Sequence, residues 1–537
     1  MSFSRAATPS ATTLSAATPS ATTSSGVDRA ELAVGALLDV VGAGVPVPLA
    51  DGREVPYANL DQAASAPCLR GVAEHVERVL PYSASVHRGT GYSSAVCTAL
   101  YEGARDAVRT FVGGRPDDVV IFTRNTTDSV NLLARSLPAQ PPDLDSARSS
   151  GGVVVFDLEH HANLLPWRSR PGYRWVPAAR TRAETLRALA TALDAAPTAL
   201  VAVTGASNVT GEVPPLAEIV RLARAAGARV FVDGAQLVPH RRVDMAALGI
   251  DYLAFSGHKL YAPFGAGVLV GRPDWLATAP PYLAGGGAVR EVTSSTVAWA
   301  DGPARHEAGS PNLLGATAIA AACRLLGALD ARDLHEHEDL LRRRLVDGLR
   351  AIDGVTIHSL WADGDGSTDD GPADDRAAGD GAAGREAAEG GGSAGPLATG
   401  PVGVVTFSVA GHDPGFVAAV LSAEHGVGVR AGRFCAHPLL GRLGAEDGAI
   451  RASVGVGSTS ADVDRLLAGL AELVGRGPRR RYRELGDGSW GPASDGRALP
   501  PWVAEHMAAG DAPGRAPVPG HAHDRAGLPA YSSPCGT

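Results

Sequence analysis

The sequence predicts an α/β protein built on a mostly parallel β-sheet, followed by a smaller α+β domain. Between residues 57 and 310, short β-branched apolar runs alternate with amphipathic helical patterns. This alternation is typical of a parallel sheet with helices on both faces. Polar side chains follow several of the runs, at the edge where open α/β sheets bind ligands. Hydrophobic residues make up 45% of the 537 residues, which is ordinary for a protein with a large buried core.

Six apolar segments are predicted as buried strands of this sheet. They are 118–122 (DVVIF), 152–157 (GVVVFD), 199–204 (ALVAVT), 229–234 (RVFVDG), 251–255 (DYLAF) and 266–271 (AGVLVG). Helical periodicity is clear at 216–227 (LAEIVRLARAAG). In the smaller domain, 402–409 and 450–456 are the clearest strands. The apolar segment 313–329 is interrupted by Arg324 and is short for a bilayer span, so we predict a core helix there.

Composition divides the chain into five parts and marks an insertion within the fourth. Residues 1–27, rich in Ser, Thr, Ala and Pro, and the Gly-, Ala- and Asp-rich insertion 362–400 cannot bury a core, so both are predicted to lack fixed structure. The remaining parts are an N-terminal segment that packs with the small domain (28–56), a large domain (57–310), a small domain (311–475) and a low-complexity tail (476–537). Within the tail, 499–507 (LPPWVAEHM) suggests a short helix.

Charge and cysteine content exclude several classes of protein. The net charge is −9, and no basic block is large enough to indicate a nucleic-acid surface. Five cysteines at wide, irregular spacing fit neither a disulfide framework nor a zinc site. The N-terminus lacks the apolar core of a signal peptide. We therefore expect a cytoplasmic protein with no bound metal and no membrane association.

Lys259 is the only lysine in the chain, and the rest of its 48 Lys and Arg residues are arginine. Arginine can replace lysine as a solvated charge, but its guanidinium does not deprotonate in proteins. A crowded lysine can lose its proton and form a Schiff base with a carbonyl. A strong bias toward arginine would also leave one stray lysine by chance, so the neighbouring residues must decide.

Polar residues at successive strand ends suit one common ligand. They are Thr126, Thr127, His160, Asn208, Asp233, Gln236, Ser256 and His258, together with Lys259. A helix N-terminus favours a phosphate, a carboxylate suits a cationic ring nitrogen, a histidine suits a flat ring, and the lysine suits a carbonyl. These features describe pyridoxal 5'-phosphate (PLP), whose sites combine a lysine Schiff base with an acidic partner for the pyridine nitrogen.

Each of these residues also has an ordinary structural explanation. Thr126 alone is better explained as a helix N-cap, Asp233 as the cap of a turn, and His160 as a hydrogen-bonded structural histidine. Those explanations require several coincidences at successive strand ends beside a solitary lysine. We therefore favour the cofactor site.

The order of the motifs resembles that of the class V aminotransferases, and most closely the group II cysteine desulfurases, also called selenocysteine lyases. The motifs are YANLDQAASAP (57–67), SVHRGTGYSS (85–94), RNTTDSVNL, EHHANLLPW, SNVTGE, VDGAQ, FSGHKLYAPFGAGVLVG (255–271), HEAGSPN (306–312), VRAGRFCAHPL (429–439) and RASVGVGSTSADVDRLLAGL (451–470). The resemblance covers about residues 30–475. It implies PLP-dependent transferase fold type I with a seven-stranded sheet, a homodimer, and PLP on Lys259.

The resemblance also implies a role for each matching residue. His160 would stack on the pyridine ring, Asp233 would keep the ring nitrogen protonated, and Gln236, helped by Asn208, would contact the ring hydroxyl. The residues implied for the phosphate are Thr127, Ser256 and His258, beside Thr126 at the same helix N-terminus, with Ser310 reaching the phosphate of the neighbouring subunit. Arg451 would bind the substrate carboxylate through a bidentate guanidinium, beside Asn208.

Cys435 separates the reactions of this family. It matches the persulfide cysteine of the desulfurases, and Arg430, Arg433 and His437 are near it in sequence, where cations would lower the pKa of a thiol. A packed, inert cysteine is the ordinary alternative. We favour that alternative for the other four cysteines and a functional role for Cys435.

The chain departs from the family pattern at three places. Arg433 and Phe434 stand where the desulfurases often carry two histidines, and Phe264 replaces a small polar residue. The segment after Arg451 reads VGVGST in place of a MYNT-like motif. These changes leave the implied cofactor residues intact and bear on the substrate and on the sulfur acceptor.

The resulting hypothesis is a PLP-dependent cysteine desulfurase. It would convert L-cysteine to L-alanine and leave the sulfur as a persulfide on Cys435, for transfer to a small thiol or an acceptor protein, with His160 as a proton shuttle. Transamination, epimerisation or another β-elimination would need Lys259 but not Cys435. A non-catalytic scaffold with a PLP fold is the third hypothesis, and the intact set of cofactor residues argues against it.

Overall fold

The computed structural model describes residues 33–138, 151–361, 400–486 and 488–509. The predicted N-terminal segment 1–27, the insertion 362–400 except its last residue, and the tail beyond 509 lie outside the described residues.

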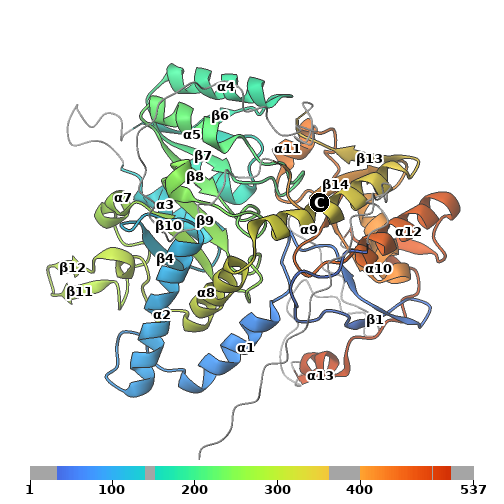
Figure 1. Cartoon of the computed structure of the whole chain (residues 1–537), viewed down its shortest axis with the longest axis horizontal. Coiled ribbons are helices and arrows are strands. Elements are labelled where there is room, and N and C mark those ends of the chain that lie inside the picture. Colours follow the sequence, from blue (N-terminus) through green and yellow to red (C-terminus); the bar gives the residue numbers. More distant parts are fainter. Residues whose placement is uncertain (1–32, 139–150, 362–399, 487, 510–537) are drawn as a thin grey trace, which may run out of the picture. The chain divides into compact units, whose positions relative to one another are not determined.

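The large sheet has seven strands and is mostly parallel, as predicted (Figure 1). In spatial order these are β4 (Val119–Thr123), β10 (Gly267–Gly271), β9 (Tyr252–Ser256), β8 (Arg229–Asp233), β7 (Thr198–Thr204), β5 (Gly152–Phe156) and β6 (Arg174–Val176). Only β10 runs against the other six. The six predicted strands agree with the observed ones to within one residue at each end. The prediction missed β6, whose three residues RWV are too few to show a pattern.

Helices cover both faces of this sheet because alternate strand residues point to opposite sides. Val230 and Val232 of β8 belong to one core cluster, and Phe231 between them belongs to another. The first cluster includes side chains of α2 (Tyr92–Phe111), α4 (Arg182–Ala195), α5 (Leu216–Ala225) and α8 (Leu313–Gly327). The second includes side chains of α3 (Thr126–Ser136) and α7 (Pro273–Thr278).

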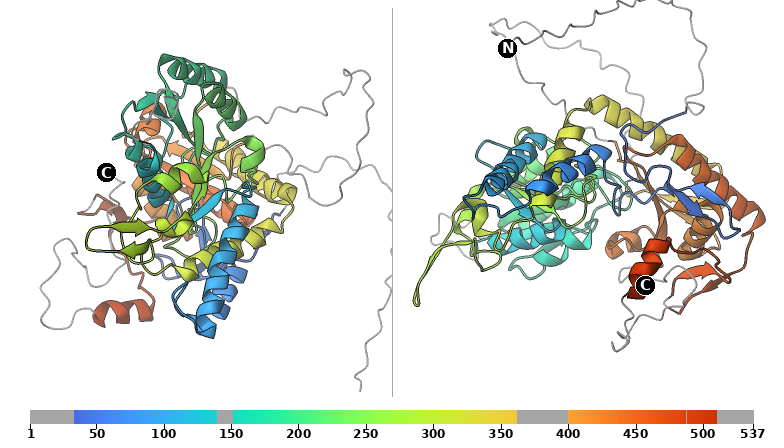
Figure 2. Two further views of the ribbon diagram at one scale, coloured as in Figure 1. Left: turned by 90° about the vertical axis from the view of Figure 1, so that its left-hand side faces the viewer. Right: turned by 90° about the horizontal axis from the view of Figure 1, so that it is seen from below.

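A second sheet of four antiparallel strands forms the other part of the structure. Its order is β13 (Val355–His358), β14 (Val404–Val409), β17 (Ala449–Ser453) and β16 (Arg430–Gly432). The helices α9 (Ala331–Arg350), α10 (Pro414–His425) and α12 (Ser460–Arg476) pack on it. Figure 2 (right) shows these yellow-to-red elements beside the blue-to-green elements of the large sheet.

The described part of the N-terminal segment contacts helices that pack on the second sheet. The Val34 N–H donates to Ser460 Oγ at 3.0 Å, and the Ala50 N–H donates to the Ala423 carbonyl at 2.8 Å. Just after this segment, β3 (Ala58–Asn59) pairs with β15 (Val427–Gly428). The helix α8 follows the predicted domain boundary at 310 but packs against α1 (Arg70–Val79) and α2 of the large domain. The division into domains therefore stays a prediction.

The remaining elements are short. They are β1 (Pro46–Pro48), β2 (Glu54–Pro56), α6 (Met245–Leu248), β11 (Val289–Val292), β12 (Val297–Trp299), α11 (His437–Arg442), β18 (Tyr482–Glu484), β19 (Trp490–Pro492), α13 (Pro501–Ala509) and the 3₁₀ turns η2 (Leu80–Tyr82), η4 (His161–Asn163), η5 (Leu165–Trp167) and η6 (Gly302–Arg305). The helix suggested at 499–507 corresponds to α13.

The predicted core helix 313–329 is α8, and eleven of its fifteen residues are buried. In the described part of the chain, no single helix is long and apolar enough to cross a membrane. Only α8 and α9 taken together meet those limits, and they meet at a 90° bend.

A buried ion cluster joins the large sheet to α9. Glu338 of α9 accepts hydrogen bonds from His240 and Arg241, which lie in the turns after β8, and all three side chains are buried. Arg241 also donates to the Pro401 carbonyl at 2.9 Å. Burial opposes the ionised form of Glu338, but the neighbouring His240 and Arg241 outweigh it and lower the pKa.

The variant Glu338→Gln is expected to lose about 3–5 kcal/mol of unfolding free energy, because it leaves the buried Arg241 charge uncompensated. Chemical denaturation would measure this loss. Glu336→Gln, at an exposed position of the same helix, is the matched control and is expected to change stability by less than about 0.5 kcal/mol. Equal stability of the two variants would contradict the assigned role of the cluster.

Candidate active site

The carboxyl ends of the central parallel strands bring several predicted site residues together. Asp233 ends β8 and lies in register between Thr204 of β7 and Ala254 of β9. Ser256 ends β9, and Lys259 follows it by three residues. His160 follows β5 by four residues. The sheet therefore places the lysine, the carboxylate and the histidine at one edge.

Lys259 lies at this edge of the large sheet and is half-buried. Burial is the main cause that lowers the pKa of Lys259, to about 8, and the Asp233 carboxylate opposes part of that shift. Nearby Arg451 lowers the pKa further, and the charges of Cys435 and Asp61 raise it. At pH 7 about a tenth of this amine is therefore neutral and nucleophilic, far more than for an ordinary lysine.

Asp233 is 4% exposed, and burial raises the pKa of its carboxyl group. The Ala235 N–H donates to Asp233 Oδ1 at 3.0 Å, and this bond and the Lys259 charge both favour the ionised form. A cationic partner stabilises a buried carboxylate of this kind, because the opposite charge offsets the cost of removing the carboxylate from water.

His160 caps the 3₁₀ turn η4 with its ring. Its Nδ1 accepts a hydrogen bond from the Ala162 N–H at 3.0 Å, so the neutral ring carries its proton on Nε2. Burial and then the Lys259 charge lower the pKa of His160 to about 3. The ring is therefore neutral at physiological pH, which suits packing against a flat aromatic group.

The residues predicted for a phosphate lie where β9 meets the start of α3. Ser256 Oγ accepts from the Thr126 N–H at 2.8 Å and lies 2.7 Å from Thr126 Oγ1. Thr127 is exposed. His258 Nδ1 is buried and has no hydrogen-bond partner within the described residues. Since buried polar atoms are normally paired, His258 points to a missing ligand.

Arg451, on β17 of the second sheet, reaches the same edge. It is buried, its Nη2 lies 3.0 Å from Asp61 Oδ1, and its Nη1 donates to the Asn208 carbonyl at 3.0 Å. Burial lowers the pKa of Arg451, and Asp61 opposes this. Arg451 Nε is buried without a partner in the part of the chain described. The guanidinium therefore retains a donor for an anionic ligand.

Two predicted residues are engaged elsewhere or lie outside this group. Gln236 is buried, and its Nε2 donates to the Ala63 carbonyl at 2.7 Å. Ser310 is exposed in the loop between η6 and α8. No hydrogen bond among the described residues joins Ser310 to the other predicted site residues.

Cys435 lies in a tight turn with unusual backbone geometry. Phe434 and Cys435 have φ angles of 52° and 53°, and the Ala436 N–H donates to the Arg433 carbonyl at 3.0 Å. Two consecutive left-handed residues inside such a bond form a type I′ turn, which normally takes Asn and Gly. Each non-glycine residue in this conformation costs about 1–3 kcal/mol, and such strain concentrates at functional sites.

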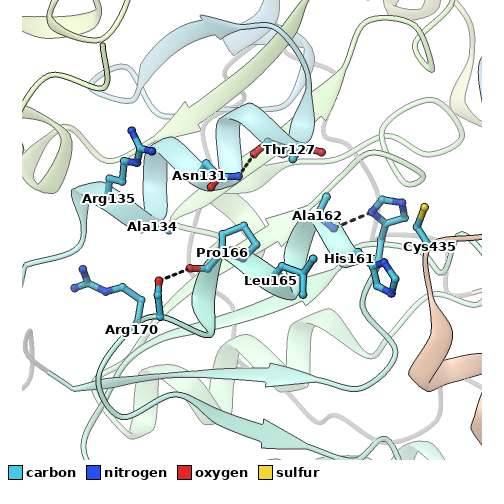
Figure 3. Close-up of a pocket in the computed structure, with 12 residues that line it drawn as sticks. Thr127, Asn131, Ala134, Arg135, His161, Ala162, Leu165, Pro166, Arg170 and Cys435 are labelled. Atoms are coloured by element: carbon cyan, nitrogen blue, oxygen red, sulfur yellow. Dashed lines mark hydrogen bonds between the residues drawn. The ribbon is translucent and has the colours of Figure 1, made fainter. Parts of the chain in front are cut away.

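The turn forms one wall of a cavity of about 760 Å³. Thr127, His160, His161 and Cys435 are among the lining residues. Figure 3 shows Cys435 and His161 at one end of this cavity, with Arg135 and Arg170 at the other. The cavity therefore connects the predicted nucleophile with the start of α3. No cluster of metal-binding side chains occurs in the residues that the structure describes.

The family model for class V aminotransferases matches residues 58–365 and 394–466. The chain belongs to this family. A cysteine desulfurase of Dickeya dadantii is 36% identical over 454 residues, which are 81% of this chain and 96% of that protein. The cysteine desulfurase of Pectobacterium atrosepticum is 32% identical over 446 residues, with 81% and 98% covered.

Solved cysteine desulfurases share the fold. The apo enzyme of Thermococcus onnurineus aligns with a TM-score of 0.64 at 30% identity, over 78% of this chain and 94% of that one. The Escherichia coli enzyme CsdA aligns with a TM-score of 0.62 at 29% identity, over 78% and 95%. The predicted family and fold type are therefore confirmed, and this class V chain is a PLP-dependent enzyme.

The residues present fit PLP. The unpartnered His258 Nδ1, the buried Asp233 carboxylate and the Lys259 amine supply complementary groups for a phosphate, a ring nitrogen and an aldehyde. These groups come from adjacent segments at the edge of one sheet.

The sequence analysis missed two supporting residues, Asp61 and Glu159, and one backbone contact of His161. Asp61 pairs with Arg451. Glu159 is fully buried, and its Oε1 accepts from the Thr204 N–H at 2.9 Å, which ties the segment before His160 to β7. The His161 N–H donates to the Cys435 carbonyl at 2.8 Å. Asp61 and Glu159 stand inside quoted motifs, but only their tertiary partners reveal their roles.

In protein freed of its cofactor, acylation of Lys259 is expected to reach half its maximal rate near pH 8, well below the value of about 10.4 for an ordinary lysine. Peptide mass spectrometry would follow this single lysine. Asp233→Asn is expected to move the midpoint to lower pH, because the Asp233 charge raises the pKa of Lys259. Asp274→Asn is the control, because Asp274 lies on α7 and forms an ion pair with Arg229 of β8. A midpoint near pH 10 in the wild type would contradict the assigned environment.

Cys435→Gly is expected to be more stable than Cys435→Ala by about 1 kcal/mol, since glycine adopts a positive φ without penalty. The matched pair at Cys97, in the interior of α2, is expected to show the opposite order by about 1 kcal/mol, because glycine weakens a helix. Denaturant titration of the four variants gives both differences. The same order at both positions would disprove the strained turn.

Proposed function

We propose that this protein is a cysteine desulfurase that converts L-cysteine to L-alanine and holds the released sulfur as a persulfide on Cys435. One observation carries the proposal. Cys435 lies on a strained turn in the wall of the cavity that His160 also lines, close enough for its charge to raise the pKa of both Lys259 and Arg451. The relatives named above are cysteine desulfurases.

The residues at the edge of the large sheet hold and tune the cofactor. Lys259 would carry PLP, Asp233 would keep the ring nitrogen protonated, and the neutral His160 ring would pack on the pyridine. Gln236, whose Nε2 donates to the Ala63 carbonyl, and Asn208 would contact the ring hydroxyl. Bound PLP supplies an electron sink for bonds broken at the substrate Cα.

The phosphate is held by residues at the start of α3 and the end of β9. Thr126, Thr127, Ser256 and His258 form this group, and the buried His258 Nδ1 gains its missing partner there. Ser310 of one subunit reaches the phosphate in the other, so the active enzyme is a homodimer. The exposure of Ser310 within one chain is consistent with such a role.

Substrate binding and proton transfer use Arg451, Lys259 and His160. Arg451 binds the carboxylate of L-cysteine, near Asn208, through a charge-assisted hydrogen bond. The Lys259 amine would take the proton from the substrate Cα. His160 Nε2, which carries the proton of the neutral ring, serves as a proton shuttle.

Sulfur transfer uses Cys435 as the nucleophile. The Cys435 thiolate forms a bond to the substrate sulfur as the Cβ–S bond breaks, and the electron pair of that bond stays with the carbon skeleton. Protonation at Cβ then completes alanine. A small thiol or a sulfur-acceptor protein takes the outer sulfur from the persulfide and restores Cys435.

The test is release of sulfide and alanine from L-cysteine in the presence of an added thiol. The wild type is expected to give the two products in equal amounts. Cys435→Ala is expected to lose at least a hundredfold in sulfide release while retaining PLP, and Lys259→Arg is expected to lose both activity and covalently held PLP. Cys68→Ala, at a half-buried cysteine, is the control and is expected to retain activity.

Two results would contradict the proposal. Equal activity of wild type and Cys435→Ala would favour another class V reaction that does not use this thiol. A wild type that holds PLP on Lys259 but releases no sulfide would exclude the desulfurase reaction itself.

A further inference from the structure

Two hydrogen bonds to backbone carbonyls of the Cys435 turn hold this turn against the large sheet. The Asn208 side-chain amide, after β7, donates to the Phe434 carbonyl at 2.8 Å. The His161 N–H, after β5, donates to the Cys435 carbonyl at 2.8 Å. These bonds fix the two left-handed residues of the turn from outside.

The Phe434 side chain adds a contact of a different kind. It is 6% exposed, and the Arg451 guanidinium carbon lies over its ring at 5.3 Å from the centroid. A cation held over an aromatic face is attracted by the ring quadrupole, more strongly where water is excluded. Arg451 also donates to the Asn208 carbonyl.

Phe434, Asn208 and Arg451 therefore form a closed set of contacts. Asn208 touches Phe434 through its side chain and Arg451 through its carbonyl, and Arg451 touches the Phe434 ring. The group proposed to bind the substrate carboxylate is thus in direct contact with the residue that precedes the nucleophile.

We propose that Phe434 is a positioning residue that sets the Cys435 thiol against the substrate sulfur by clamping the turn to Arg451. The inference rests on the proposed function of Arg451 and Cys435. A neutral aromatic ring suits a contact with the buried Arg451 because it attracts the guanidinium without adding a titratable group.

The test separates sulfur transfer from the earlier proton transfer at Cα. Phe434→Leu removes the aromatic face but keeps an apolar side chain, and Phe434→Tyr keeps the face. Exchange of the Cα proton of L-alanine in D₂O, followed by NMR, needs Lys259, the cofactor and the carboxylate site but not the thiol. Phe434→Leu is expected to lower kcat for sulfide release at least tenfold and to change the exchange rate less than threefold. Phe434→Tyr is expected to restore sulfide release to within threefold of the wild type.

A second measurement reports on the turn itself. The rate of alkylation of Cys435 by iodoacetamide, read on its own peptide in protein freed of cofactor, is expected to change at least threefold in Phe434→Leu and to stay within twofold in Phe434→Tyr. Phe416→Leu, at a half-buried aromatic residue of α10, is the control variant and is expected to leave all three rates within twofold.

The outcomes distinguish this inference from the proposed function. If proton exchange and sulfide release fell equally in Phe434→Leu, the positioning role would be overturned. The ring would then support the carboxylate site and not the position of the thiol. Unchanged sulfide release in Phe434→Leu would overturn the positioning role as well. A wild type without sulfide release would refute the desulfurase proposal before any variant is compared.

Discussion

The site depends on the burial of one amine beside one carboxylate at the carboxyl edge of a parallel sheet. Asp233 is the last residue of β8, and Lys259 follows the neighbouring strand β9. Burial opposes the charged form of both groups, and the charge of each favours the charged form of the other. Desolvation leaves Lys259 with a pKa of about 8, while a fully solvated lysine would stay protonated and unreactive near neutral pH. Arginine at this position would remove the chemistry, which explains why a chain so rich in arginine retains one lysine.

The second sheet carries the residues on which the type of reaction would depend in the proposed function. Arg451 from β17 and Cys435 from the turn after β16 meet the large sheet at Asn208 and His161. The two sheets therefore contribute different parts of the chemistry. In the proposed function, the large sheet would hold the cofactor, and the second sheet would bind the substrate carboxylate and carry the thiol. The ion cluster around Glu338 links the two sides away from the site.

Most of the large sheet, and the gathering of the candidate cofactor residues at one of its edges, could be predicted from sequence because their signals are local. Buried parallel strands are continuous β-branched runs, and polar residues that end such runs necessarily share one edge. The strand β6 could not be predicted, since three residues carry no period. The roles of Asp61 and Glu159 also could not, because each depends on a partner that is distant in the sequence.

The geometry around Cys435 shows a different limit of sequence analysis. Phe-Cys is a poor choice for a type I′ turn by local propensity. The turn forms because Asn208, His161 and Arg451 hold it from three separate segments. A local rule broken in this way is expected at functional sites. The motif order could indicate that Cys435 was functional, but only the tertiary contacts explain its placement.

The most direct test of the account is to locate the sulfur after a single turnover. The holoenzyme would be mixed with less than one equivalent of L-cysteine and no added thiol, alkylated at once, and mapped by peptide mass spectrometry. The account predicts one additional sulfur atom on the peptide that contains Cys435, in an amount equal to the alanine formed. Alanine without that modification, or the extra sulfur on the peptide of Cys68, Cys97 or Cys323, would contradict it.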